Sequence, residues 1–113
     1  NASYIAAVIA PSGLVGLAGA HHWDKDKKQV ELGYWFARKA WGNGYATEAA
    51  KAVCDFAFDH WPIDKIIVSV FDDNPASKRV VEKLGFKETG PHTIYSVGRK
   101  AEVSATWYDL ART

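Results

Sequence analysis

Two glycines stand one residue apart before an alanine-rich stretch with helical spacing, in WGNGYATEA at residues 41–49. The N-terminus of a helix gathers unpaired backbone N–H groups and the positive end of the helix dipole, so it attracts anions. Gly42 and Gly44 leave room for an anion to approach, and Arg38 and Lys39 add positive charge upstream. These residues predict a pyrophosphate cradle. Glycines also occur in such connections purely to form the turn, and the motif alone does not separate the two interpretations.

Two common phosphate-binding loops do not match this stretch. The dinucleotide-binding pattern GxGxxG requires a glycine where Thr47 stands, and no Walker-type GK[ST] sequence is present. A dinucleotide-binding unit is therefore a weak alternative, also because the connection between residues 30–36 and Gly42 is long.

Other reactive side chains have simpler explanations. His21 and His22 lie near Asp24 and Asp26, but adjacent residues of a strand point to opposite faces, and the two acids fall in a turn. We therefore expect no metal site. Cys54 falls on the apolar stripe of a predicted helix, where a core position is favoured over a nucleophile.

Composition limits the range of partners and domains. The 113 residues carry 14 Lys and Arg against 13 Asp and Glu, interleaved along the chain, for a formal net charge of +1. This balance does not favour nucleic-acid binding, and the length fits a single domain over residues 1–113. One cysteine excludes an internal disulfide and favours a reducing compartment, so we expect a cytoplasmic protein.

The first apolar segment has two interpretations. Residues 4–20 contain no charge, which is compatible with a signal peptide or a membrane segment. Residues 11–13, PSG, interrupt this segment with turn-forming residues, and no basic stretch precedes it. A β-hairpin is therefore expected, without a membrane anchor. Because the chain has no methionine and begins on an apolar run, we expect that its natural N-terminus is missing or processed.

Periodicity predicts the remaining elements. Strands are expected at residues 4–10, 14–23, 30–36 and 65–71, with a further extended segment from residue 86 and a strand at 102–110. Apolar spacing predicts an amphipathic helix at residues 45–60. Asn74, Pro75 and Gly85 supply a cap, a first helical residue and a stop for a second helix. The order β-β-β-α-β-α-β-β indicates one mixed α/β sheet, an antiparallel meander followed by a parallel β-α-β crossover.

Two stretches together carry a family resemblance. ELGYWFARKAWGNGYATEA at residues 31–49, followed by NPASKRVVEKLGF at residues 74–86, closely resembles the GNAT acetyltransferases, and specifically their RimJ/RimL-like branch. The likeness covers nearly the whole chain. It implies a GNAT-like fold whose first strand and two early helices are missing here. It also implies that the strands at residues 30–36 and 65–71 splay apart to admit the pantetheine arm of acetyl-CoA.

The resemblance implies acetyl-CoA as co-substrate. The family's Q/RxxGxG/A signature corresponds here to Lys39, Gly42 and Gly44, with lysine in place of Gln or Arg, so the side chain meets phosphate as a point charge. Asn74 is expected to bond the pantetheine arm, to cap its helix, or both. Backbone N–H groups are expected to hold the thioester oxygen from Tyr34, Trp35 and Phe36, and the pyrophosphate from Trp41, Gly42, Asn43, Gly44, Tyr45 and Ala46.

The resemblance also suggests catalytic residues. Glu31 stands where relatives often carry the carboxylate that deprotonates the amine, directly or through water; alternatively it points to solvent or pairs with Lys27 or Lys28. The tyrosine that commonly protonates the leaving thiolate is replaced by Val81. Ser77, three residues after Asn74, is then the expected acid, with water as the alternative.

The function that follows is acetyl-CoA-dependent N-acetyl transfer, without metal or covalent intermediate. The acceptor is expected to be a primary amine, either a protein N-terminal α-amine or a small amine. A noncatalytic acyl-CoA-binding module is the alternative. We expect a monomer or a homodimer.

Overall fold

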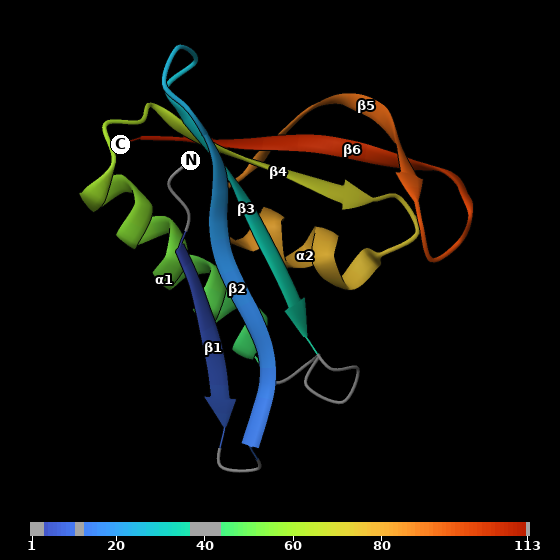
Figure 1. Cartoon of the computed structure of the whole chain (residues 1–113), viewed down its shortest axis with the longest axis horizontal. Helices are drawn as coiled ribbons and strands as arrows, with labels where there is room; N and C mark the ends of the chain where they lie inside the picture. The colour runs from blue at the N-terminus through green and yellow to red at the C-terminus, as the bar shows by residue number, and fades with distance from the viewer. Residues whose placement is uncertain (1–3, 11–12, 37–43, 113) are drawn as a thin grey trace.

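The computed structural model describes residues 4–10, 13–36 and 44–112. Within these ranges the chain forms six strands and two helices in the order that the sequence predicted (Figure 1). Their bounds are β1 Tyr4–Ala10, β2 Gly13–Asp24, β3 Gln29–Phe36, α1 Tyr45–His60, β4 Lys65–Phe71, α2 Pro75–Lys83, β5 Lys87–Ser96 and β6 Ala101–Ala111. The expected hairpin is confirmed, because β1 and β2 pair antiparallel. Neither described helix is long and apolar enough to cross a membrane.

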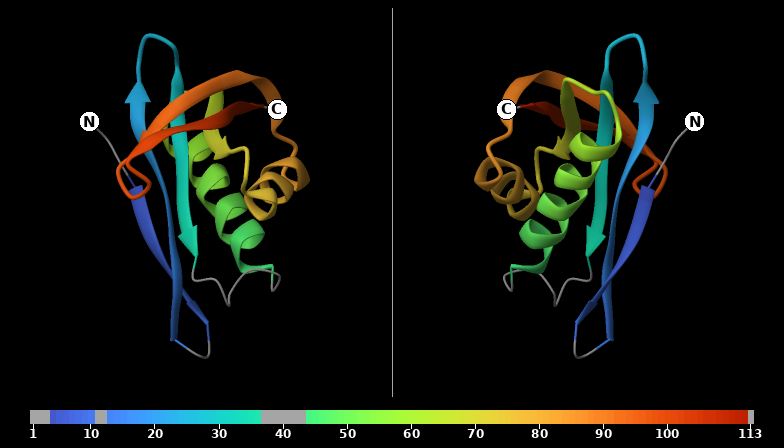
Figure 2. Two further views of the ribbon diagram at one scale, coloured as in Figure 1. Left: turned by 90° about the vertical axis from the view of Figure 1, so that its right-hand side faces the viewer. Right: turned by 90° about the vertical axis from the view of Figure 1, so that its left-hand side faces the viewer.

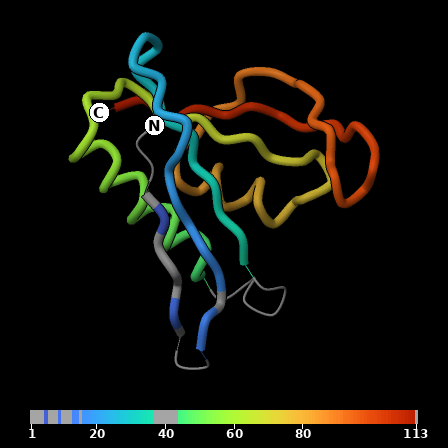
Figure 3. The backbone as a smooth tube through the Cα atoms, in the orientation of Figure 1, coloured from blue at the N-terminus to red at the C-terminus, as the bar shows by residue number. Residues whose placement is uncertain are grey.

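The described strands form one mixed sheet in the order β1-β2-β3-β4-β6-β5. The first three strands make an antiparallel meander, and β3 pairs with β4 in parallel. Strand β6 then lies between β4 and β5 and is antiparallel to both, a path that can be followed along the tube in Figure 3. The predicted meander and parallel crossover are confirmed.

The core lies on the face of the sheet that carries both helices, which Figure 2 shows on the same side of β2 and β3. Alternation along the strands buries Val30 and Leu32 of β3 and Ile66 of β4 on this face. Ala50 of α1 and Val81 of α2, neither exposed at all, belong to the same cluster. Burying this apolar surface is the main force that fixes the two helices on the sheet.

Strands β3 and β4 separate after a short paired segment. Their parallel ladder contains three residue pairs, the last of them Glu31 with Ile67, although β3 continues to Phe36 and β4 to Phe71. Figure 1 shows the two strands diverging beyond this point. The predicted splay is therefore present in the described part of the chain. It opens the sheet between the second halves of β3 and β4.

Helix α1 begins at a glycine with a left-handed backbone. Gly44, the N-cap, has a φ of 80° and provides no side chain to cap the helix. The predicted amphipathic pattern is confirmed, with one side of the helix buried and the other exposed. Ala50, Val53 and Cys54 are buried, while Lys51 and Asp55 are exposed and form an ion pair of 2.8 Å.

Helix α2 has the predicted start and end. The Asn74 side chain accepts a hydrogen bond of 3.1 Å from the Ser77 N–H, and Pro75 is the first helical residue. At the other end Gly85 has a φ of 95° and donates its N–H to Glu82 O at 3.1 Å. The Phe86 N–H bonds Val81 O at 3.0 Å, which completes a Schellman motif.

We expect Gly85→Ala to lower the free energy of unfolding by about 1 kcal/mol, because an L-residue at this left-handed φ is strained. Added atoms are not the cause, since a Cβ at Gly85 would meet only Leu110 Cδ1, at an ordinary 3.7 Å. Urea unfolding measures the loss. Gly98→Ala is the control, because Gly98 is exposed and lacks a positive φ. An equal loss in both variants would contradict the backbone explanation.

Candidate active site

The opening between β3 and β4 is the first part of the candidate site. It has a volume of about 500 Å³ and reaches from the splayed strands to the first turn of α2. Its lining residues are Glu31, Leu32, Gly33, Tyr34, Trp35, Phe36, Val68, Ser69, Phe71, Asn74, Ser77 and Ile94. The structure thus gathers in one opening the two predicted catalytic residues and the four cofactor-contacting residues expected on β3 and at Asn74.

A tyrosine and a serine form a short hydrogen bond at this opening. The Tyr34 hydroxyl oxygen and Ser77 Oγ lie 2.6 Å apart, and the same Tyr34 oxygen lies 3.4 Å from the Ser77 backbone carbonyl oxygen. Ser77 is buried, with 8% of its surface exposed, and its N–H is held by Asn74. The first turn of α2 is therefore fixed to β3 across the opening.

Burial keeps the Tyr34 phenol protonated. Loss of solvent raises the pKa of Tyr34 above its usual value of 10.0, and the hydrogen bond to Ser77 offsets only part of this effect. A neutral phenol can donate its proton in the hydrogen bond to Ser77 Oγ. With Tyr34 as donor, the Ser77 hydroxyl hydrogen is available to a group in the opening.

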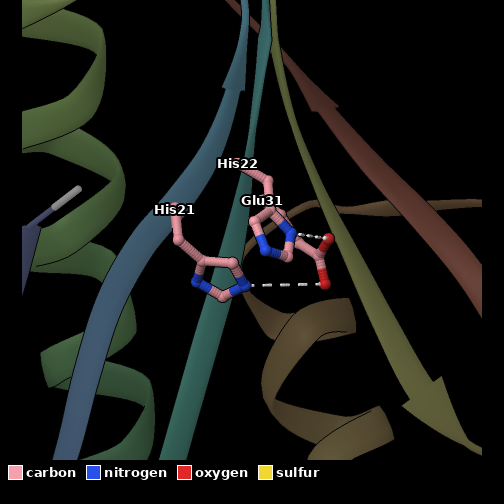
Figure 4. A group of neighbouring side chains, drawn as sticks. All are labelled: His21, His22 and Glu31. Atoms are coloured by element: carbon pink, nitrogen blue, oxygen red, sulfur yellow. Dashed lines mark hydrogen bonds and ion pairs between the residues drawn. The ribbon is translucent and has the colours of Figure 1, made fainter. Parts of the chain in front are cut away.

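Glu31 is surrounded by histidines rather than by the lysines considered from the sequence. Its Oε1 lies 3.3 Å from His22 Nδ1, and its Oε2 lies 3.8 Å from His21 Nε2 (Figure 4). The expectation that His21 and His22 point to opposite faces is wrong. The β2–β3 register shifts between His21 and Asp24, and His22 has a left-handed φ of 56°, so both rings reach the same carboxylate.

A third histidine, His92, also contacts a residue of the opening, which was not predicted from the sequence. His92 is half-buried and its ring stacks on Trp107, with centroids 4.4 Å apart. Its Nε2 shares a hydrogen bond of 2.8 Å with Ser69 Oγ, and Ser69 lines the opening. Because β6 lies between β4 and β5, sequence spacing gave no signal for this pair. His60, at the end of α1, is exposed.

A second hollow lies between the start of α1 and one side of α2. It has a volume of about 520 Å³ and is lined by Gly44, Ala46, Thr47, Ala76, Arg79, Val80, Glu82 and Lys83. The hollow combines the uncapped N-terminus of α1 with two cations, Arg79 and Lys83, at helical i,i+4 spacing on α2. Neither cation was predicted from the sequence to bind a ligand. The helix dipole favours an anion here, and the two cations outnumber the one acid of the lining, Glu82.

The predicted phosphate-binding residues fall partly within the described chain. Gly44 and Ala46 line the second hollow, while Tyr45 packs against the core. Outside the described residues lie Lys39, Trp41, Gly42 and Asn43. A Cβ added at Gly44 would meet no described atom within 4 Å, so its glycine is required by the positive φ and not by local crowding.

Cys54 belongs to the core, as expected. It is 3% exposed, and burial is the main reason that the pKa of its thiol rises to about 12. The reactive thiolate is therefore scarce at neutral pH. Of the remaining aromatic residues predicted near the cofactor, Phe36 is buried, whereas Trp35 is 60% exposed beside the opening.

Curated relatives match parts of the chain. The YkkB protein of Bacillus subtilis (strain 168) is 48% identical over 56 residues, which are 50% of this chain and 33% of that protein. The N-acetyltransferase YoaA of the same strain is 34% identical over 77 residues, covering 68% of this chain and 44% of that protein. The chain spans less than half of the length of these relatives.

Solved structures match nearly the whole chain. The ribosomal-protein-S5-alanine acetyltransferase from Vibrio fischeri has a TM-score of 0.87 at 17% identity, over 96% of this chain and 61% of that one. The microcin C7 self-immunity acetyltransferase MccE, solved with acetyl-CoA and AMP, has a TM-score of 0.85 at 18% identity, over 97% and 61%. These similarities confirm the predicted fold.

A family model identifies the chain independently of these structures. The model of the acetyltransferase (GNAT) domain matches residues 1–87, which include both splayed strands and all of α2. The resemblance inferred from ELGYWFARKAWGNGYATEA and NPASKRVVEKLGF is thereby confirmed. The chain belongs to the GNAT acetyltransferase family.

Proposed function

We propose that the protein transfers an acetyl group from acetyl-CoA directly to a primary amine. The observation that carries this proposal is the opening between β3 and β4, which has a carboxylate, Glu31, at one end and the hydroxyl of Ser77 at the α2 side. Amine acetylation needs a base for the ammonium proton and benefits from an acid for the leaving sulfur. The two residues supply these groups in one opening.

The proposed reaction has four steps. Glu31, directly or through one water molecule, removes a proton from the ammonium group and leaves a neutral amine. The amine nitrogen attacks the thioester carbonyl, and backbone N–H groups of the segment from Tyr34 to Phe36 stabilise the resulting oxyanion. The carbon–sulfur bond then breaks. The thiolate takes its proton from the Ser77 hydroxyl, which the Tyr34 phenol stabilises through their 2.6 Å hydrogen bond, and the surplus proton of the acetylated nitrogen returns to the Ser77 oxygen through water.

We propose that the phosphates of acetyl-CoA occupy the second hollow, beside Gly44. The uncapped start of α1 and the charges of Arg79 and Lys83 support this placement. The structure of MccE contains acetyl-CoA, which supports the same class of ligand for this chain. Asn74 lines the opening, and its capping bond to Ser77 N leaves its side-chain amide group able to donate to the pantetheine arm.

We expect the double substitution of Arg79 and Lys83 by alanine to weaken acetyl-CoA binding by about tenfold, since two exposed cations near a phosphate each contribute a fraction of a kcal/mol to about 1 kcal/mol. Isothermal titration calorimetry measures the dissociation constant, and the difference from wild type should shrink as salt increases. Lys87→Ala removes an exposed cation from outside the hollow and is the control. If wild type, the double variant and Lys87→Ala bind acetyl-CoA with equal affinity, the phosphates do not occupy this hollow. Gly44→Val tests the same hollow less cleanly because the left-handed φ also strains the new residue.

The experiment that tests the function follows thiol release from acetyl-CoA over a panel of peptides with free N-termini, polyamines and other small amines. Acetylation of one class above the rate without acceptor supports the proposal and identifies the acceptor. The ribosomal-protein acetyltransferase among the structural relatives makes the peptide N-terminus our first choice. Tight acetyl-CoA binding without turnover on any acceptor would instead indicate a noncatalytic acyl-CoA-binding module.

Two further properties complete the proposal. The buried free thiol of Cys54 is consistent with a reducing compartment, and we propose the cytoplasm. We also propose a monomer or a homodimer, which sedimentation velocity distinguishes directly.

A further inference from the structure

Three side chains from two neighbouring strands bring potential metal ligands together. One ring nitrogen of His21, one ring nitrogen of His22 and one carboxylate oxygen of Glu31 all lie within 4.8 Å of one another (Figure 4). Two imidazole nitrogens and one carboxylate make up a ligand set that zinc enzymes use, with a fourth position left for water. We propose that His21, His22 and Glu31 form a binding site for Zn²⁺.

The backbone holds this arrangement in place. Glu31 lies directly opposite His21 in the β2–β3 ladder and opposite Ile67 in the β3–β4 ladder. The backbone that carries the Glu31 carboxylate is therefore paired on both sides. The His21 ring lies over Gly33: a Cβ there would be 2.7 Å from His21 Cε1. Gly33 of β3 therefore leaves the space that the His21 ring of β2 occupies, so both strands determine the position of this ring.

The unusual backbone of His22 completes the set. In a regular strand its ring would leave the face that carries His21 and Glu31. The register shift after His21 and the left-handed φ of 56° at His22 return the ring to Glu31. The two histidine rings meet edge to face, with centroids 4.4 Å apart. Both rings thus approach one carboxylate from the same side of the sheet.

Distances favour a small ion with nitrogen ligands. With zinc–ligand bonds of about 2.0–2.2 Å, two atoms of a tetrahedral site are separated by about 3.3 Å. The pair His22 Nδ1 and Glu31 Oε1 already has this separation, 3.3 Å, and His21 Nε2 lies 3.8 Å from Oε2. These distances are to different carboxylate oxygens, and the three ligand atoms lie within 4.8 Å of one another, so the two ring nitrogens must move closer together to bind one ion. The His22 side chain is 72% exposed and can rotate to do so. Mg²⁺ and Ca²⁺ prefer oxygen ligands and are disfavoured here.

Metal binding would compete with the proposed chemistry. This consequence rests on the proposed function, in which Glu31 accepts a proton from the amine. A carboxylate bound to Zn²⁺ is a much weaker base, so occupied protein should lose acetyl transfer while the phosphate hollow, built from other residues, still binds acetyl-CoA. Zinc binding itself does not depend on this role of Glu31.

The binding test uses untagged protein without acetyl-CoA, titrated with Zn²⁺ in a calorimeter and with Co²⁺ in an absorption spectrometer. We expect one ion per chain, tetrahedral Co²⁺ bands without thiolate charge transfer, and no binding of Mg²⁺. His22→Ala should weaken binding by more than about tenfold because one of three protein ligands is lost. His60→Ala is the control, since His60 is exposed outside the cluster. Absent binding, or equal weakening by both variants, would overturn the site.

A second measurement separates this inference from the proposed function. Acetyl transfer is assayed with chelator and then with increasing Zn²⁺. Inhibition at the concentration that fills the site, lost in His22→Ala, supports both ideas. Stoichiometric binding with unchanged activity would retain the metal site but remove Glu31 from the reaction. Activity with chelator, together with absent binding, would retain the function and overturn the metal site.

Discussion

We expect Glu31→Gln to lower kcat by about 10²- to 10⁴-fold, which is the contribution of a positioned general base to catalysis. Glutamine keeps the size of the side chain and its oxygen for a histidine partner, but it cannot accept the ammonium proton. The acetyl-CoA dissociation constant should remain unchanged, because the phosphate hollow contains none of the same residues. Steady-state kinetics and calorimetry measure the two quantities separately.

The dependence of this loss on pH identifies the cause. With a peptide acceptor, whose α-amine has a pKa of about 7.7–8.0, the fraction of neutral amine rises as the pH passes from 7 to 9. The need for a base then decreases, so the ratio of wild-type to Glu31→Gln activity should fall with rising pH. Glu102→Gln, at an exposed strand position, is the matched control. A ratio that stays constant would assign Glu31 a structural role.

Ser77→Ala is expected to reduce kcat by about ten- to a hundredfold with little change in acetyl-CoA affinity, because it removes the proposed proton donor to sulfur. The effect is smaller than for Glu31 because a thiolate is a moderately good leaving group and water can enter the space. Single-turnover thiol release measures the step. Ser104→Ala, at an exposed strand position, is the control.

The partner of Ser77 sharpens this prediction. Tyr34→Phe removes the phenol that lies 2.6 Å from Ser77 Oγ but leaves the serine hydroxyl in place. If Ser77 protonates sulfur and Tyr34 only orients it, Tyr34→Phe should cost less than Ser77→Ala, and the double variant should be no worse than Ser77→Ala. A larger loss in Tyr34→Phe than in Ser77→Ala would transfer the role of acid to the tyrosine.

Features determined by short segments were predictable from the sequence. The start and end of α2 depend on Asn74, Pro75 and Gly85, each acting within a few residues through a cap, a fixed φ or a positive φ. Apolar periodicity similarly identified α1 and the strands. The motif around Gly44, combined with the later one, was sufficient to recognise the family and hence the splayed strands.

Contacts between distant strands were not predictable in the same way. The pair Tyr34 and Ser77 is separated by 43 residues, and Ser69 meets His92 across an intervening strand. The convergence of His21 and His22 depends on a local register shift, which strand alternation does not reveal. These interactions require knowledge of which strands are neighbours and where their pairing slips.

The short ladder between β3 and β4 has a mechanical consequence. Among the described strands, β1, β2 and β3 form one three-stranded ribbon and β4, β6 and β5 another, and only three residue pairs join the two directly. The sheet is therefore most easily deformed where β3 meets β4, whereas each ribbon is stiffened by long antiparallel ladders. A ligand that fills the opening contacts both ribbons and restrains their relative motion. When acetyl-CoA binds, amide hydrogen exchange should therefore slow in the second halves of both β3 and β4, because the ligand restrains local opening of both strands.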